Sequence, residues 1–122
     1  MDIRRFYELT GGDYDAAIQR FMAESRLEKF TRMFEQDPSY GELESSLAAD
    51  NLKEAFRAAH TLKGVCLNLS FTGLSQSADA VTELLRHADA DRPHCLEQVN
   101  LCMETLRGRY KEVIAAIREL DS

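Results

Sequence analysis

A long apolar repeat near the C-terminal end limits the fold of this 122-residue chain more than any other feature. Apolar residues alternate at spacings of three and four over Leu96, Val99, Met103, Leu106, Tyr110, Val113, Ile117 and Leu120. This spacing puts all of them on one side of a helix of about seven turns. Pro93 marks the helix start, because proline is tolerated at the first helical position. The repeat predicts a long bundle helix, with a coiled-coil dimer as the competing interpretation.

Most of the remaining sequence also has helical periodicity, interrupted by caps, prolines and glycines. The expected segments lie at about 2–9, from Tyr14 onward, after Asp37-Pro38, at 52–69, and from Thr72 or Gly73 to a break around 89–93. The start at 52 follows from Asn51 and Glu54, which resemble a capping box. No segment alternates as a half-buried strand does. We therefore expect an all-α fold, an antiparallel four-helix bundle with an additional short N-terminal helical segment.

Composition narrows the class of protein. The length fits one domain, residues 1–122, with a proper core. Twenty-one acidic and fifteen basic residues give a net charge of −6, which argues against a nucleic-acid binder because phosphate contacts need a basic face. No apolar run approaches the ~20 residues of a membrane span, and no signal peptide is visible. Three widely spaced cysteines make a poor disulfide framework, although one disulfide is not excluded, and we expect a cytoplasmic protein.

The segment 52–69 departs from the ordinary amphipathic pattern. On a helical wheel, one side holds the expected core residues Ala55, Ala58, Leu62, Val65, Cys66 and Leu69. The opposite side holds Phe56, Arg57, His60, Lys63, Gly64, Leu67 and, if the helix reaches it, Phe71. Large apolar side chains around a polar centre are typical of a docking surface. The pattern predicts that a partner docks on Phe56, Arg57, Leu67 and Phe71 and approaches closely at His60.

The polar centre of this face suits the handling of a phosphoryl group. A neutral imidazole such as that of His60 is a nucleophile, and free histidine is largely neutral at pH 7. Lys63 lies one turn further on, where its ammonium reaches phosphoryl oxygens, and Gly64 beside the histidine permits close approach. No carboxylate cluster follows His60, so we expect Mg²⁺ on the partner. The charged residues within a turn of His60, Arg57 and Lys63, are both basic.

The stretch Ala59-His60-Thr61-Leu62-Lys63-Gly64 resembles the H-x-L-K-G signature of histidine-containing phosphotransfer (HPt) domains. Ala58 and Asn68-Leu69 add to the resemblance, which extends in pattern over about 27–86. It implies a four-helix bundle in which His60 is phosphorylated, with Lys63 and Gly64 in support. Ser70 is a departure, because the family usually has glycine ten residues after the histidine. Glycine tolerates the left-handed conformation that ends helices better than serine does.

The resemblance favours a carrier of phosphate between receiver-domain aspartates in a two-component phosphorelay. We expect receiver domains of response regulators, a hybrid histidine kinase, or both as partners. We expect no resident cofactor or metal and no autonomous kinase activity. An HPt-like bundle that binds receivers as an adaptor without carrying phosphate is the alternative. We expect a monomer, although the 96–120 repeat leaves a dimer open.

The other reactive and aromatic side chains are expected to be structural. Cys66, Cys95 and Cys102 are interpreted as small buried hydrophobic residues, since no pair has the short spacing of a zinc site. A Cys/His metal bundle is therefore only a third hypothesis. The remaining expectations place His87 and His94 at the surface and Phe30 and Phe34 in the core.

Overall fold

The computed structural model describes residues 1–88 and 91–121, and over these residues it contains helices and no strand. The elements are α1 (Ile3–Thr10), α2 (Tyr14–Phe21), α3 (Glu24–Met33), the 3₁₀ turn η1 (Phe34–Gln36), α4 (Ser39–Ala48), α5 (Leu52–Asn68), α6 (Thr72–Arg86) and α7 (Arg92–Arg118). The predicted all-α class is confirmed. Part of the predicted break at 89–93, residues 89 and 90, lies outside the described residues. None of the described helices combines the length and apolar character that a bilayer crossing needs.

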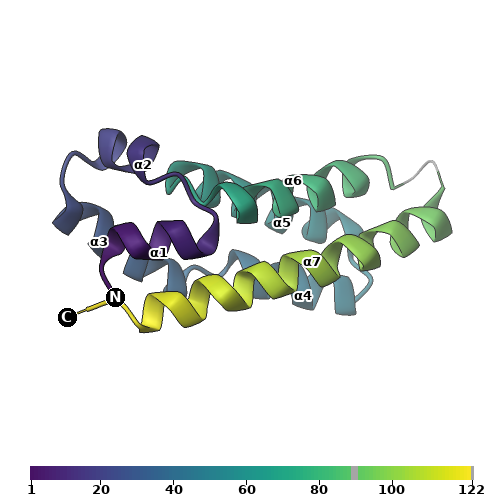
Figure 1. Cartoon of the computed structure of the whole chain (residues 1–122). Helices are drawn as coiled ribbons and strands as arrows, with labels where there is room; N and C mark the ends of the chain where they lie inside the picture. Colours follow the sequence, from purple (N-terminus) through teal and green to yellow (C-terminus); the bar gives the residue numbers. More distant parts are fainter. Residues whose placement is uncertain (89–90, 122) are drawn as a thin grey trace.

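Helices α4 to α7 form the four-helix bundle (Figure 1). α5 packs against α4 and α6, and α6 packs against α7. The rings of Tyr40 on α4 and Tyr110 on α7 stack with their centroids 3.8 Å apart, which joins the remaining pair of helices. Arg107 of α7 also donates two hydrogen bonds, of 2.8 and 2.9 Å, to the carboxylate of Glu44 on α4. The bundle is thus closed on all four sides, with α1 to α3 packed at one end.

The apolar repeat is used inside this bundle. Six of its residues are buried: Val99, Met103, Leu106, Val113, Ile117 and Leu120. Leu96 and Tyr110 are partly buried. The helix starts at Arg92, where the carboxylate of Asp91 accepts a hydrogen bond from the His94 N–H. The prediction of a bundle helix is confirmed, because the apolar side of α7 is covered by the rest of the same chain.

The N-terminal segment consists of three helices. α1 and α2 begin where the sequence predicted, with the carboxylates of Asp2 and Asp13 accepting hydrogen bonds from N–H groups of their first turns, at 2.8 and 3.0 Å. The chain then breaks at Met22, which has a left-handed φ of 74°, before α3 starts at Glu24. Neither Met22 nor Ala23 is a typical helix breaker, so the sequence pattern gave no sign of this break.

The C-terminal end of α5 is closed around Ser70. The N–H of Phe71 donates to the Cys66 carbonyl at 2.9 Å, and the N–H of Ser70 donates to the Leu67 carbonyl at 3.1 Å. These are the two bonds of a Schellman motif, which places one residue in the left-handed region. Ser70 is that residue, with a φ of 57°. α5 therefore ends in the left-handed conformation that glycine adopts easily, and serine adopts it here at a cost in conformational energy.

The N-terminal helices hold this same end of α5. Arg20 of α2 donates hydrogen bonds to the carbonyls of Leu67 and Asn68, at 2.8 and 2.6 Å. The buried hydroxyl of Tyr7 on α1 donates to the Leu69 carbonyl at 2.6 Å. Burial raises the pKa of Tyr7 to about 12, so its hydroxyl remains protonated over the neutral range. Residues distant in sequence thereby satisfy carbonyls that a helix end otherwise leaves to water.

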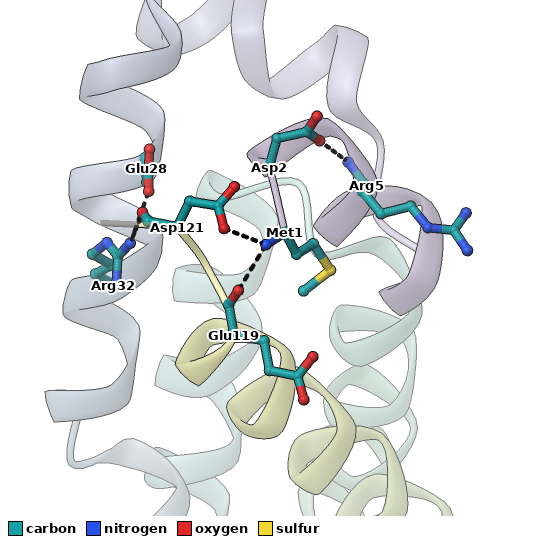
Figure 2. Close-up of polar contacts among 7 residues, drawn as sticks. All are labelled: Met1, Asp2, Arg5, Glu28, Arg32, Glu119 and Asp121. Atoms are coloured by element: carbon teal, nitrogen blue, oxygen red, sulfur yellow. Dashed lines mark hydrogen bonds and ion pairs between the residues drawn. The ribbon is translucent and has the colours of Figure 1, made fainter.

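The two ends of the described chain lie side by side (Figure 1). The amino group of Met1 donates to the Glu119 carbonyl at 3.0 Å and to the Asp121 carboxylate at 2.6 Å (Figure 2). The N–H of Asp121 donates back to the Met1 carbonyl at 2.9 Å. Arg32 of α3 donates to the Asp121 carbonyl and to the Glu28 carboxylate. α1, α3 and the end of α7 are tied together at this corner.

Candidate functional site

His60 lies near the middle of α5, on the side of the helix that faces away from the core. Its side chain is exposed, whereas its neighbours Ala58 and Ala59 are buried. α5 begins as predicted, since Asn51 accepts a hydrogen bond from the Glu54 N–H at 3.2 Å. His60 is therefore presented on a regular helix, well away from either end, where its backbone is fixed.

One side of His60 is occupied by an aromatic ring and a guanidinium. The ring centroids of Phe56 and His60 lie 6.1 Å apart. Arg86, at the end of α6, places its guanidinium carbon 5.0 Å from the centre of the Phe56 ring. Arg86 also pairs with Glu83 at 3.1 Å. Phe56 is half-buried and packs partly against the core, so only part of it is available to a partner.

The basic side chains around His60 are all paired with acids. Lys63 forms an ion pair of 2.8 Å with Asp79 on α6. Arg57 approaches the Glu54 carboxylate at 3.5 Å within α5 itself. The sequence predicted a local excess of positive charge because it counted only the neighbours along the chain. Across the helix interface, Asp79 brings a negative charge to the same surface.

On its other side, α5 borders an open groove. The groove runs between α5 and the α3–η1 segment, and its lining residues are Phe30, Met33, Phe34, Gln36, Asp37, Pro38, Thr61, Gly64, Val65, Asn68 and Leu69. A Cβ at Gly64 would meet no heavy atom within 4 Å apart from its chain neighbours and the nearby backbone of its own helix. Nothing in the isolated fold therefore requires glycine here, although glycine in a helix costs about 1 kcal/mol relative to alanine. The free space faces outward, beside His60.

The comparison with known families agrees with this geometry. A family model described as Hpt domain matches residues 23–118, which is most of the chain. The chain belongs to the HPt family. No curated protein and no solved structure matches it. HPt domains are phosphocarrier modules of two-component phosphorelays that interact with receiver domains and kinases. The helices α1 and α2, up to Phe21, precede the residues that the family model covers.

Two of the aromatic residues in this HPt domain lie elsewhere than predicted. Phe71 was predicted on the docking face, and this prediction is wrong because its side chain is only 2 % exposed. The tight turn at Ser70 directs Phe71 inward, where its ring lies 5.2 Å from that of Phe34. Phe30 was predicted in the core, whereas it is 39 % exposed at the rim of the groove. Leu67, at 53 % exposed, lies on the outer face as predicted.

The cysteines of the HPt domain lie mostly inside the fold. All three are free thiols; Cys66 and Cys95 are buried as predicted, and Cys102 is only partly buried. Burial raises the pKa of Cys66 to about 12, which keeps this thiol protonated. Over residues 1–88 and 91–121, no group of three or more His, Cys, Asp or Glu side chains is arranged to hold a metal ion. His87 and His94 are exposed, as expected.

Sequence reasoning missed four residues next to this HPt site. Asp79 and Arg86 come from α6, and Phe30 and Met33 come from α3. Asp79 and Arg86 are seven residues apart, which puts them on one face of α6. That spacing was visible, but only the register between α5 and α6 shows that this face lies beside His60.

Proposed function

We propose that this HPt domain carries a phosphoryl group between receiver-domain aspartates, with His60 as the carrier. The observation that carries the proposal is an exposed mid-helix histidine followed by Lys63 and by an unobstructed Gly64, within an HPt family match. A neutral ring nitrogen of His60, Nε2, attacks the phosphorus of an aspartyl phosphate. The bond between phosphorus and the aspartate oxygen breaks, and the carboxylate leaves with the electron pair.

The proposal gives the neighbouring residues supporting roles. Transfer of this kind depends on alignment and on stabilisation of charge rather than on further covalent chemistry. The ammonium of Lys63 pairs with phosphoryl oxygens, and the open space at Gly64 lets the receiver backbone come close. Mg²⁺ is supplied by the receiver. We propose that the domain acts as a phosphoryl carrier without autonomous kinase activity.

We propose that the receiver docks over the groove beside α5. Three apolar side chains are exposed on this side: Leu67 and Met33 at 53 % each, and Phe30 at 39 %. Phe30 and Met33 line the groove together with Gly64, and Leu67 lies two turns beyond His60 on α5. Phe56 and Arg57, about one turn before His60 on α5, complete the proposed docking surface. An apolar patch around a polar centre is typical of an interaction site.

We further propose that residues 1–122 form one domain that acts as a monomer in the cytoplasm. The hydrogen bonds from Tyr7 and Arg20 to the end of α5 support the first point, since they join the N-terminal helices to the bundle. The burial of the α7 repeat within the chain supports a monomer. The three free thiols fit a reducing compartment.

The test is phosphoryl transfer from a receiver domain carrying ³²P on its aspartate. We expect label on the wild type that is stable to alkali and labile to acid, as phosphohistidine is. His60→Gln should take up none, and the matched variant His94→Gln, which changes an exposed histidine on α7, should label like the wild type. Label that persists in His60→Gln would contradict the assignment of the carrier.

The adaptor alternative gives a different pattern in the same assay. If the domain is an adaptor, the wild type and His60→Gln should bind the receiver with equal affinity, and neither protein should be labelled. A binding titration run beside the labelling assay therefore separates the two functions.

A further inference from the structure

The ion pair between Lys63 and Asp79 differs from the other charged pairs around His60. Arg57 pairs with Glu54, and Arg86 with Glu83, each within its own helix. The Lys63–Asp79 pair joins α5 to α6, at 2.8 Å, with side chains 29 % and 47 % exposed. The residue that follows His60 by one turn is thus already engaged before any phosphoryl group arrives.

This pair places a negative charge beside the cation that the proposed phosphoryl group would use. Lys63 and His60 are three residues apart on one helix, so their side chains are neighbours on its surface. The Lys63 ammonium touches the Asp79 carboxylate, and its flexible four-carbon stem lets it reach either partner. A phosphoryl group on His60 and the carboxylate of Asp79 therefore compete for one cation.

We propose that Asp79 is a positioning residue that keeps the phosphoryl group on His60 ready to leave. The inference rests on the proposed carrier function. When His60 takes the phosphoryl group, the new bond is between Nε2 and phosphorus, and the proton stays on Nδ1. Lys63 turns toward the phosphoryl oxygens and Asp79 loses its partner. In the return step a receiver carboxylate oxygen attacks phosphorus, the nitrogen–phosphorus bond breaks with its electron pair returning to Nε2, and Lys63 pairs with Asp79 again.

Asp79 has two electrostatic effects, and both destabilise the phosphoryl group on His60. It draws Lys63 away from the phosphoryl group, and it repels that group directly as a like charge. A carrier must accept phosphate from one aspartate and give it to another, so a phosphohistidine that is too stable would slow the second step. Asp79 lowers that stability without touching the reacting atoms.

The test is the equilibrium ratio of phosphorylated His60 to phosphorylated receiver, measured for wild type and Asp79→Asn with one receiver domain. Exposed charge pairs of this kind shift equilibria by about two- to fivefold, so we expect the ratio to rise by that factor in Asp79→Asn. Asp79→Glu should restore the wild-type ratio. The matched control is Asp50→Asn, which breaks another exposed ion pair of an aspartate, between Asp50 just after α4 and Arg92 at 2.6 Å.

Two further readouts separate positioning from a purely structural role. The rise should shrink as salt is added, because exposed charges are screened. The rise caused by Asp79→Asn should be at least halved when Lys63 is also changed to methionine, because competition for the cation no longer exists in that background. A structural ion pair would change the melting temperature but not the transfer ratio.

The outcomes distinguish this inference from the function on which it rests. A folded, labelled Asp79→Asn with the wild-type ratio would overturn the role of Asp79 and leave the carrier function intact. Absence of label on His60 in both proteins would overturn both.

Discussion

Helices α5 and α7 have similar inner faces and very different outer faces. Both direct an apolar stripe into the bundle, and both contain a mid-helix glycine, Gly64 or Gly108, beside open space. α7 extends over 27 residues and carries mainly charged and polar side chains outward, whereas α5 has 17 residues and presents His60 and Leu67. The inner faces account for the fold. The outer face of α5 is where the molecule departs from the pattern that folding alone requires.

The largest expected effect is on stability, and it distinguishes the buried side from the exposed side near the end of α5. Phe71→Ala should lower the free energy of unfolding by about 3–5 kcal/mol, because it empties a buried site among aromatic rings. Leu67→Ala should change it by less than about 0.5 kcal/mol, because Leu67 is exposed. Urea denaturation measures both. Only Leu67→Ala is expected to weaken receiver binding while the fold stays intact, and equal stability losses in the two variants would contradict the assignment of faces.

The two mid-helix glycines give the next contrast. Gly64→Ala and Gly108→Ala should each stabilise the protein by about 1 kcal/mol, since neither new methyl group meets an atom beyond its chain neighbours and the nearby backbone of its own helix. Gly64→Ala should also slow phosphoryl transfer by roughly tenfold or more, because small misplacements of the reacting groups are costly. Gly108→Ala should transfer at the wild-type rate. Thermal melts and single-turnover transfer assays test this pair of variants. An unchanged transfer rate in Gly64→Ala would contradict the idea that the receiver backbone must come close to residue 64.

The two helix ends differ in backbone strain. α5 ends with Ser70 at a φ of 57°, whereas α7 ends with Glu119 at a φ of −97°. Ser70→Gly should stabilise the protein by about 0.5–1 kcal/mol, the relief of strain exceeding the extra freedom of glycine in the unfolded chain. Ser45→Gly, inside α4, should destabilise it by a similar amount. Equal effects of the two changes on the melting temperature would contradict strain at Ser70.

The smallest expected effect concerns the ion pair that anchors α7 to α4. The hydrogen bonds from Arg107 lower the pKa of Glu44 below its ordinary value of 4.5. Because the folded-state pKa is the lower one, this stabilisation is present above pH 4.5 and is lost as the pH falls through the folded-state value. Glu44→Gln should cost less than about 1 kcal/mol at pH 7, since the carboxylate is 31 % exposed.

A pH series of urea denaturation checks this last prediction. The wild type and Glu44→Gln should converge in stability as the pH falls below 4.5. A difference that stayed constant across the series would mean that the charge of Glu44 contributes nothing.

Local patterns were enough to predict most helices and the centre of the site. The spacing from Leu96 to Leu120 predicts α7 because only a helix puts those residues on one side. Asn51 and Glu54 predict the start of α5 because their hydrogen bond is local. His60, Lys63 and Gly64 share one short segment, so their grouping on one face also follows from the sequence.

The parts that sequence reasoning missed depend on contacts between helices or on single backbone angles. Asp79 reaches Lys63 only because α6 packs against α5 in one register. Phe71 turns inward because Ser70 adopts a left-handed conformation, which a wheel drawn through residue 71 cannot represent. The break at Met22 has no local signal at all. Helical periodicity carries no information on any of these features.

The hydrogen bonds that close the end of α5 also affect the entropy that is lost when a partner binds there. The donors from Arg20 and Tyr7 lie 47 to 62 residues away in sequence, so this end cannot fray without loosening α1 and α2. Isolated helices lose order first at their ends. Here the end carrying Leu67 is ordered before any partner arrives. An encounter at this surface therefore loses little conformational entropy, and more of each contact remains as affinity.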